Sequence, residues 1–163
     1  MISLGEWSNY LAATAEVAAT LTGLVFVAVS INLTRVLKLP GLIGRAAESL
    51  MQLFVVVIIS TNALIPGQNS ATLGAKTLAL GGLLWVVETG LHIRFLRGKP
   101  TKWRRWVILR ILQTQFANIP FCVCGILLMR GSSTAMYWLP TGFVFSLLAG
   151  VIGAWVLLVE ILR

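Results

Sequence analysis

The sequence contains no aspartate, one histidine and two cysteines, and only 11% of its 163 residues are charged. A soluble domain carries about a quarter charged residues, so this shortage excludes an ordinary water-soluble fold. The acidic residues are five glutamates: Glu6, Glu16, Glu48, Glu88 and Glu160. Apolar residues make up 58% of the chain and the mean hydropathy is +0.90. Such a composition is typical of a polytopic membrane protein.

The common catalytic and transport motifs are also missing. The sequence has no phosphate-binding G-x-x-x-x-G-K, no H-E-x-x-H and no G-x-S-x-G. It lacks a T-V-G-Y-G potassium filter and a pair of matching half-repeats with broken helices. Cys122 and Cys124 match no zinc spacing and lie on nearly opposite faces of a helix, which predicts buried free thiols. The sequence therefore predicts a protein that is not an enzyme and has no cofactor or metal.

Five apolar runs are each long enough to cross a bilayer, which needs about 20 residues of helix. Glycine and proline, which end helices, separate these runs. The predicted fold class is all-α: a polytopic transmembrane helix bundle that forms a single domain over residues 1–163. The expected spans are about 10–34, 47–66, 71–97, 105–129 and 136–162.

Lysine and arginine gather on one side of the predicted spans. Cytoplasmic loops accumulate these residues, which predicts an N-terminus outside and a C-terminus inside a cell membrane, most simply the bacterial plasma membrane. The largest basic group is Arg94, Arg97, Lys99, Lys102, Arg104 and Arg105. Either these charges only fix the topology, or they also bind anionic lipid headgroups specifically, at about 1 kcal/mol each. The net charge of +8 thus indicates lipid rather than nucleic acid as a partner.

The first predicted helix carries small and polar residues along one face. At about 100° per residue, five of them fall on one line and are called the polar stripe: Glu16, Thr20, Gly23, Val27 and Ser30. In one interpretation the polar stripe is a packing seam, in which hydroxyls bond their own backbone and small residues admit a neighbouring helix. In the other, copies of this helix surround a hydrated path, with Glu16 as a ring of carboxylates at its outer mouth.

Glu88 lies well inside the third predicted span. A lone carboxylate in lipid costs at least about 2.5–3.5 kcal/mol, so Glu88 is expected to face protein or water. His92 follows one helical turn later. The pair is either a proton-sensitive gate or relay, or part of a structural tie between helices in which Glu88 pairs with His92 or with an arginine of the basic loop. Asn118, in the fourth span, is expected either to satisfy backbone carbonyls freed by Pro120 or to bond to another helix.

The stretch AATLTGLVFVAVSINLTRVLKLPGLIGRAAESL resembles small bacterial polytopic membrane proteins of an actinobacterial type. These share a GLVFVA(V/L)S first helix followed by a PGL-GRA-E loop. The resemblance covers roughly the first half of the chain. Some of these proteins are labelled as modulators of an FtsH-type membrane protease, so the resemblance implies a regulatory role and a membrane-protein partner.

A weaker resemblance is to the Orai calcium channels. The stretches TGLVFVAV, LFVVVIISTNALIP and LLWVVETGL resemble three helices of that family, with Glu88 at the position of a third-helix glutamate. The chain departs from the family at Ile31, which stands where those channels have their selectivity glutamate. It also has five predicted spans rather than four, and its first helix runs in the opposite direction. The resemblance is not adopted as membership and implies only an oligomeric pore.

The leading hypothesis is a homo-oligomeric, channel-like cation pore with the first helix near the symmetry axis and the polar stripe along the path. Glu88 and His92 would bias opening or hold the bundle. The alternative is a non-conducting regulatory or scaffold protein that binds another membrane protein, such as an FtsH-type protease, through the same face.

Overall fold

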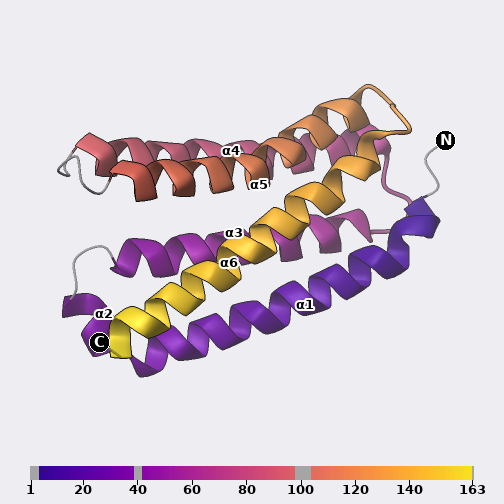
Figure 1. Cartoon of the computed structure of the whole chain (residues 1–163). Helices are drawn as coiled ribbons and strands as arrows, with labels where there is room; N and C mark the ends of the chain where they lie inside the picture. The colour runs from indigo at the N-terminus through magenta and orange to yellow at the C-terminus, as the bar shows by residue number, and fades with distance from the viewer. Residues whose placement is uncertain (1–3, 39–41, 98–103, 163) are drawn as a thin grey trace. The chain divides into compact units, whose positions relative to one another are not determined.

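The structure, a computed structural model, describes residues 4–38, 42–97 and 104–162 (Figure 1). Every regular element within these residues is a helix. In chain order they are α1 (Leu4–Ile31), α2 (Leu33–Lys38), α3 (Leu42–Ala63), α4 (Ser70–Arg97), α5 (Arg104–Met129), η2 (Ala135–Tyr137) and α6 (Trp138–Leu162).

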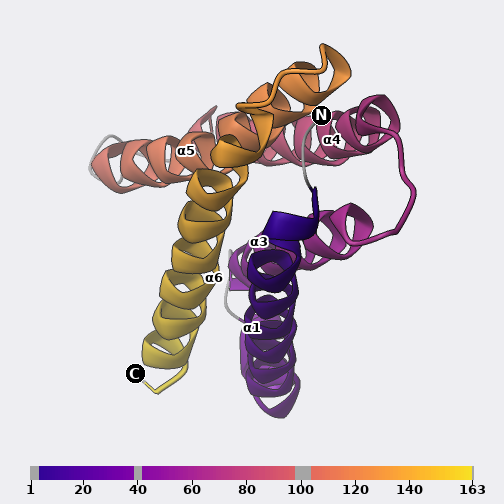
Figure 2. The same ribbon diagram turned by 90° about the vertical axis from the view of Figure 1, so that its right-hand side faces the viewer.

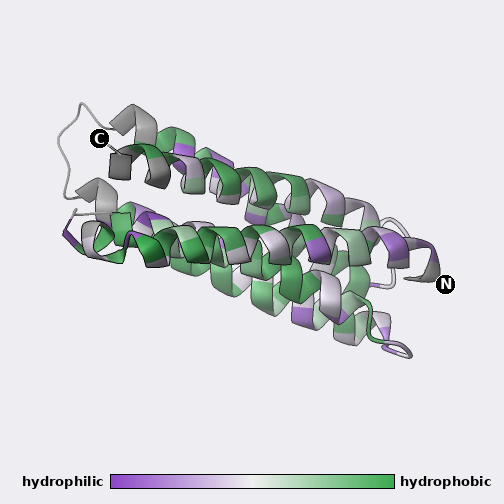
Figure 3. Cartoon of the chain, turned by 90° about the horizontal axis from the view of Figure 1, so that it is seen from below, coloured by the Kyte–Doolittle hydropathy of each residue, from purple (hydrophilic) through white to green (hydrophobic). Residues whose placement is uncertain are grey.

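Five helices of the described chain are long and apolar enough to cross a membrane. These candidate spans are Glu6–Ile31, Leu42–Ala63, Ser70–Arg94, Val107–Met129 and Ala135–Val156. Coloured by hydropathy, the long helices are apolar over most of their length, with polar residues at separate points (Figure 3). The all-α class and the five spans are therefore confirmed, and the chain is a multi-pass integral membrane protein.

The first helix differs from its predicted range at both ends. It begins at Leu4 rather than near residue 10, and it ends at Ile31, before α2 begins at Leu33. At this point the Asn32 Nδ2 donates to the Ala28 carbonyl oxygen at 2.9 Å. An asparagine side chain that bonds the backbone locally competes with the regular helix ladder.

Glycine and asparagine shape two of the turns between helices: the turn after α5 and the turn between α3 and α4. Gly131 follows α5 with φ of 70°, and its N–H donates to the Leu128 carbonyl at 3.0 Å, which satisfies one of the last carbonyls of the helix. Before α4, Asn69 Oδ1 accepts from the Ala71 N–H at 3.1 Å and caps the helix start. Gly67, also at φ 70°, turns the chain between α3 and α4.

The chain divides into two compact units, each with its own packing. Unit 1 covers Ile65–Phe145, which contains α4, α5, η2 and the start of α6; unit 2 covers Leu4–Leu64 and the rest of α6 from Ser146. The division falls inside α6, so this helix belongs to both units. The predicted single domain over residues 1–163 stays a prediction.

In unit 1, α4 and α5 lie side by side and antiparallel (Figures 1 and 2). Glycine lets their backbones approach: a Cβ added at Gly74 would lie 2.7 Å from the Gly125 carbonyl oxygen, and one added at Gly125 would lie 2.7 Å from the Leu78 Cβ. Gly81 is equally tight against the Phe121 Cβ, at 2.7 Å. Small residues at such an interface favour helix association in lipid, where no hydrophobic effect drives it.

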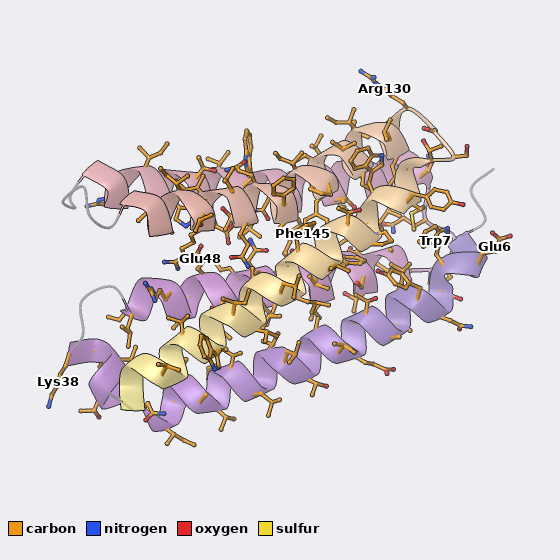
Figure 4. All side chains as sticks on the ribbon, viewed as in Figure 1. Glu6, Trp7, Lys38, Glu48, Arg130 and Phe145 are labelled. Carbon is orange, nitrogen blue, oxygen red and sulfur yellow. The ribbon has the colours of Figure 1, made fainter. Side chains whose placement is uncertain are left out.

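In unit 2, α1 runs alongside α3, and the short α2 also contacts α3 (Figure 1). The α6 helix contributes two further glycines: Gly150 is tight against the Leu53 side chain and Gly153 against Ser49. At the ends of this unit the chain carries charge. Glu6, at the start of α1, and Lys38, at the end of α2, lie at opposite ends of it (Figure 4).

Gly81 and Gly82 are neighbours that provide a matched test of the α4–α5 packing. Gly81→Ala is expected to reduce the free energy of unfolding by about 1–3 kcal/mol, because the new methyl group overlaps the Phe121 Cβ. Gly82→Ala is the control, since a Cβ there meets nothing within 4 Å. Denaturation by sodium dodecyl sulfate in mixed micelles, followed by circular dichroism, measures both. Equal stabilities of the two variants would contradict the packing.

Candidate functional site

The polar stripe on α1 lies on the exposed side of that helix. The buried residues of α1 are Leu11, Thr14, Ala18, Thr22 and Val25. At about 100° per residue, Ala18 and Val25 point roughly 180–200° away from Glu16. All five residues of the polar stripe are exposed. The packing of the chain thus uses the face of α1 opposite to the polar stripe.

The threonines of α1 bond to their own helix on both faces. Thr20 Oγ1, in the polar stripe, donates to the Glu16 carbonyl oxygen at 2.8 Å. On the buried face, Thr14 donates to the Tyr10 carbonyl and Thr22 to the Ala18 carbonyl, each at 2.7 Å. The hydroxyl protons of these threonines are therefore satisfied within α1. This leaves the Glu16 carboxylate as the costliest exposed group of the polar stripe in a bilayer.

Glu16 lies closer to the middle of its candidate span than to either end, which corrects the predicted place at the outer mouth, because α1 begins earlier than expected. The span begins at Glu6, so Glu16 is ten residues, or about 15 Å of helix rise, further along. Its exposed neighbours include Val17 and Leu24, which are 51% and 62% exposed. In a single chain embedded in lipid, this carboxylate would face hydrocarbon.

The second candidate site is a set of polar contacts between α4 and α5, in unit 1. Glu88 is only 1% exposed, and its Oε2 accepts a hydrogen bond from Asn118 Nδ2 at 2.6 Å. Glu88 therefore faces protein, as predicted, and Asn118 follows the second of its two expected roles, a bond to another helix. His92 is also buried, at 5% exposed. The predicted tie between Glu88 and His92 stays a prediction.

Gln115 adds two contacts beside this pair. Its Oε1 accepts a hydrogen bond from the Trp85 indole N–H, and its Nε2 donates to Thr89 Oγ1 at 3.3 Å. Sequence reasoning did not assign Trp85, Thr89 or Gln115 to a site. The signal was present, because residues three or four apart share a helix face, which places Trp85 near both Glu88 and Thr89, and Gln115 beside Asn118.

These contacts join α4 to α5. Among the described residues, no group of three or more His, Cys, Asp or Glu side chains could hold a metal ion. Both cysteines are free; Cys124 is buried, as predicted, whereas Cys122 is only partly buried and corrects that prediction. The two cysteines differ because a spacing of two residues turns their side chains to nearly opposite sides of α5.

The basic group lies partly within the described residues. Arg94 is exposed near the end of α4, Arg97 is the last residue of α4, and Arg104 and Arg105 begin α5. Because α4 and α5 are antiparallel neighbours, these backbone positions lie at one end of unit 1. Lys99 and Lys102 lie outside the described residues. Binding of anionic headgroups here stays a prediction.

Comparison with protein-family models, with curated proteins and with solved structures gave no match. The geometry of α1 and of the α4–α5 contacts is therefore the basis for the function proposed below.

The Glu88–Asn118 hydrogen bond is testable with a double-mutant cycle. Asn118→Leu is expected to lower the free energy of unfolding by about 1–3 kcal/mol or more, because it leaves a buried carboxylate oxygen without its donor. In a Glu88→Leu background the same change is expected to cost at least about 1 kcal/mol less.

Gln113→Leu, a similar change elsewhere on α5, is the control and is expected to behave alike in both backgrounds. Denaturation in mixed micelles measures all variants. Additive effects of Asn118→Leu and Glu88→Leu would show that the two side chains do not depend on each other.

Proposed function

We propose that the chain is a homo-oligomeric membrane protein in which α1 helices of several copies surround an axis and form a cation-conducting path. The polar stripe would line this path. The supporting observation is the exposure of Glu16 on the side of α1 opposite to its buried face. Burying that carboxylate in lipid costs at least about 2.5–3.5 kcal/mol, which an assembly with a hydrated axis avoids.

The small side chains near Glu16 favour a second copy of the chain as the group that covers it. Ala19 is exposed, and a Cβ added at Gly23 meets nothing within 4 Å, so a neighbouring helix has room to approach closely. Most soluble assemblies of one chain are closed and symmetric, and the same cyclic symmetry in a membrane would bring the same face of every copy to the axis. A ring of Glu16 carboxylates would then attract cations.

The other predicted features fit around this path. In this proposal Glu88 and His92, buried in unit 1, hold α4 to α5 or bias opening. The N-terminus faces outward, and the basic residues at the ends of α4 and α5 face anionic lipid on the cytoplasmic side of a bacterial plasma membrane.

A second candidate function is a non-conducting scaffold or regulator. The observation that favours it is the Thr20 hydroxyl, which donates to its own helix and so needs no water or pore. Because this hydroxyl proton is already bonded within α1, the polar stripe also suits a water-free interface with a different membrane protein, such as an FtsH-type protease.

Ion flux through liposomes distinguishes the two functions. Purified wild-type protein is expected to pass small cations in preference to anions, and Glu16→Gln is expected to reduce that preference about tenfold, because it removes one negative charge per copy from the path. Glu6→Gln is the matched control: this glutamate is also exposed on α1, at the start of the candidate span, and its loss is expected to change selectivity little.

Absence of flux in the wild type, or equal selectivity in wild type and Glu16→Gln, would remove the polar stripe from any conducting path. Recovery of a stoichiometric foreign membrane protein by cross-linking in native membranes would then support the scaffold.

A further inference from the structure

Two serines of unit 2 are completely buried, and their hydroxyls have no hydrogen-bond partner among the described residues. These are Ser60, on α3, and Ser146, on α6, each with an exposed fraction of 0%. The other buried hydroxyls of unit 2 do have partners: Thr14, Thr22 and Ser49 each donate to a carbonyl of their own helix. A buried hydroxyl without a partner is unfavourable, and most such groups in proteins bond to protein or to ordered water.

Two glycines of α6 define which faces of α3 and α6 meet in unit 2. A Cβ added at Gly153 would overlap the Ser49 hydroxyl, and a Cβ added at Gly150 would overlap the Leu53 side chain. The residue numbers fall along α6 as they rise along α3, so the two helices are antiparallel at this contact. Small residues at such a contact let helices pack closely in lipid.

The same contact brings the two serines to nearly the same level. Ser60 is seven residues beyond Leu53 on α3, which is about 10.5 Å of helix rise and only about 20° from the Leu53 face. Ser146 is four residues before Gly150 on α6, which is about 6 Å of rise and about 40° from the Gly150 face. Because the helices are antiparallel, both displacements point the same way, and the two levels differ by about 4.5 Å.

One water molecule suits both this separation and the chemistry of the two hydroxyls. A water that lies about 2.8 Å from each of two oxygens joins groups up to about 5.6 Å apart. Water both donates and accepts hydrogen bonds, as a serine hydroxyl does. No charged residue lies within four positions of Ser60 or Ser146 in the sequence, which favours a neutral ligand over an ion.

The last turn of α3 offers a third partner for such a water. Ser60 lies in this turn, where the final four carbonyl groups accept no hydrogen bond from within the helix. The N–H of Leu64, one turn further along, donates to the Thr61 carbonyl at 3.2 Å. The Ser60 carbonyl can therefore accept from the water, which would then have about three polar partners, the usual number for a buried water.

We propose that Ser60 and Ser146 bind one water molecule, which joins α3 to α6 inside unit 2. The inference does not rest on the proposed function, because both serines belong to one unit of a single chain. The water does for α3 and α6 what the Glu88–Asn118 bond does for α4 and α5: it satisfies buried polar groups at a helix contact. Ser146 is the first residue of α6 in unit 2, so the water fixes α6 where it enters that unit.

Solid-state nuclear magnetic resonance of the full chain in phosphatidylcholine bilayers tests the site directly. The experiment measures the rate at which water protons transfer magnetisation to the Cβ of each serine. We expect transfer to Ser60 and Ser146 to be several times faster than transfer to Ser49. Ser49 is the matched control, because it is also a buried serine of α3 but donates to the Arg45 carbonyl at 3.0 Å.

A double-mutant cycle tests whether the two hydroxyls act together. Ser60→Ala and Ser146→Ala are each expected to raise the equilibrium constant for unfolding about fivefold, because the water loses one hydroxyl partner. The double variant is expected to raise it by a similar factor, well below the roughly 25-fold product of independent changes. Ser49→Ala combined with Ser146→Ala is the control and is expected to be multiplicative. Denaturation in mixed micelles measures all variants.

The contrary outcomes are distinct. Transfer that is no faster at Ser60 and Ser146 than at Ser49, or fast at only one of the two, overturns the water site, and this result on the wild type does not depend on the folding of any variant. Multiplicative effects of Ser60→Ala and Ser146→Ala overturn the bridge, because each hydroxyl then acts alone. Greater stability of both alanine variants also overturns it, because the hydroxyls are then buried without a partner.

Discussion

A carboxylate inside a membrane needs a partner, because hydrocarbon offers neither water nor hydrogen bonds. Within the described residues, three glutamates lie at least six residues inside a candidate span: Glu16, Glu48 and Glu88. Glu16 and Glu88 have contrasting surroundings. Glu88 is buried and accepts a hydrogen bond from Asn118 within unit 1. Glu16 is exposed on α1, on the face turned away from the buried residues of that helix. The Glu88 carboxylate is buried within the chain and accepts a hydrogen bond there through Oε2, whereas the Glu16 carboxylate needs a partner from outside the chain.

The α4–α5 pair illustrates how helices associate where burial of apolar surface contributes little. In one half of the pair, Gly74, Gly81 and Gly125 bring the backbones close together, which favours van der Waals contact. In the other half, Glu88–Asn118 and the contacts of Gln115 join the helices by hydrogen bonds. Such bonds fix the register of two helices, because a slip by one residue would leave a buried polar group without its partner.

The parts of this arrangement that follow from composition and spacing were predictable from the sequence. The five spans depend on the length of apolar runs, and this prediction is confirmed. The cost of its charge predicted that Glu88 faces protein or water, and the structure buries it in protein. The break at Asn32 was not predicted, because the apolar run continues across it and neither glycine nor proline marks it. The bond between Asn118 and Glu88 was one of two options, since the sequence does not specify which helix lies beside α5. For the polar stripe, helical spacing showed in the sequence that its residues share one face of α1. Only the structure shows that this face is exposed rather than packed against the rest of the chain.

Oxidative cross-linking of single cysteines on α1 in native membranes tests most directly whether copies of the chain meet at the polar stripe. Cys122 and Cys124 are first replaced by alanine, and cysteine is then introduced at Thr20 or, on the buried face, at Thr22. The account predicts a dimer of the chain, formed by a disulfide between two copies, for Thr20→Cys and little or none for Thr22→Cys. Equal cross-linking at both positions, or a Thr20→Cys variant that stays uncross-linked, would contradict it.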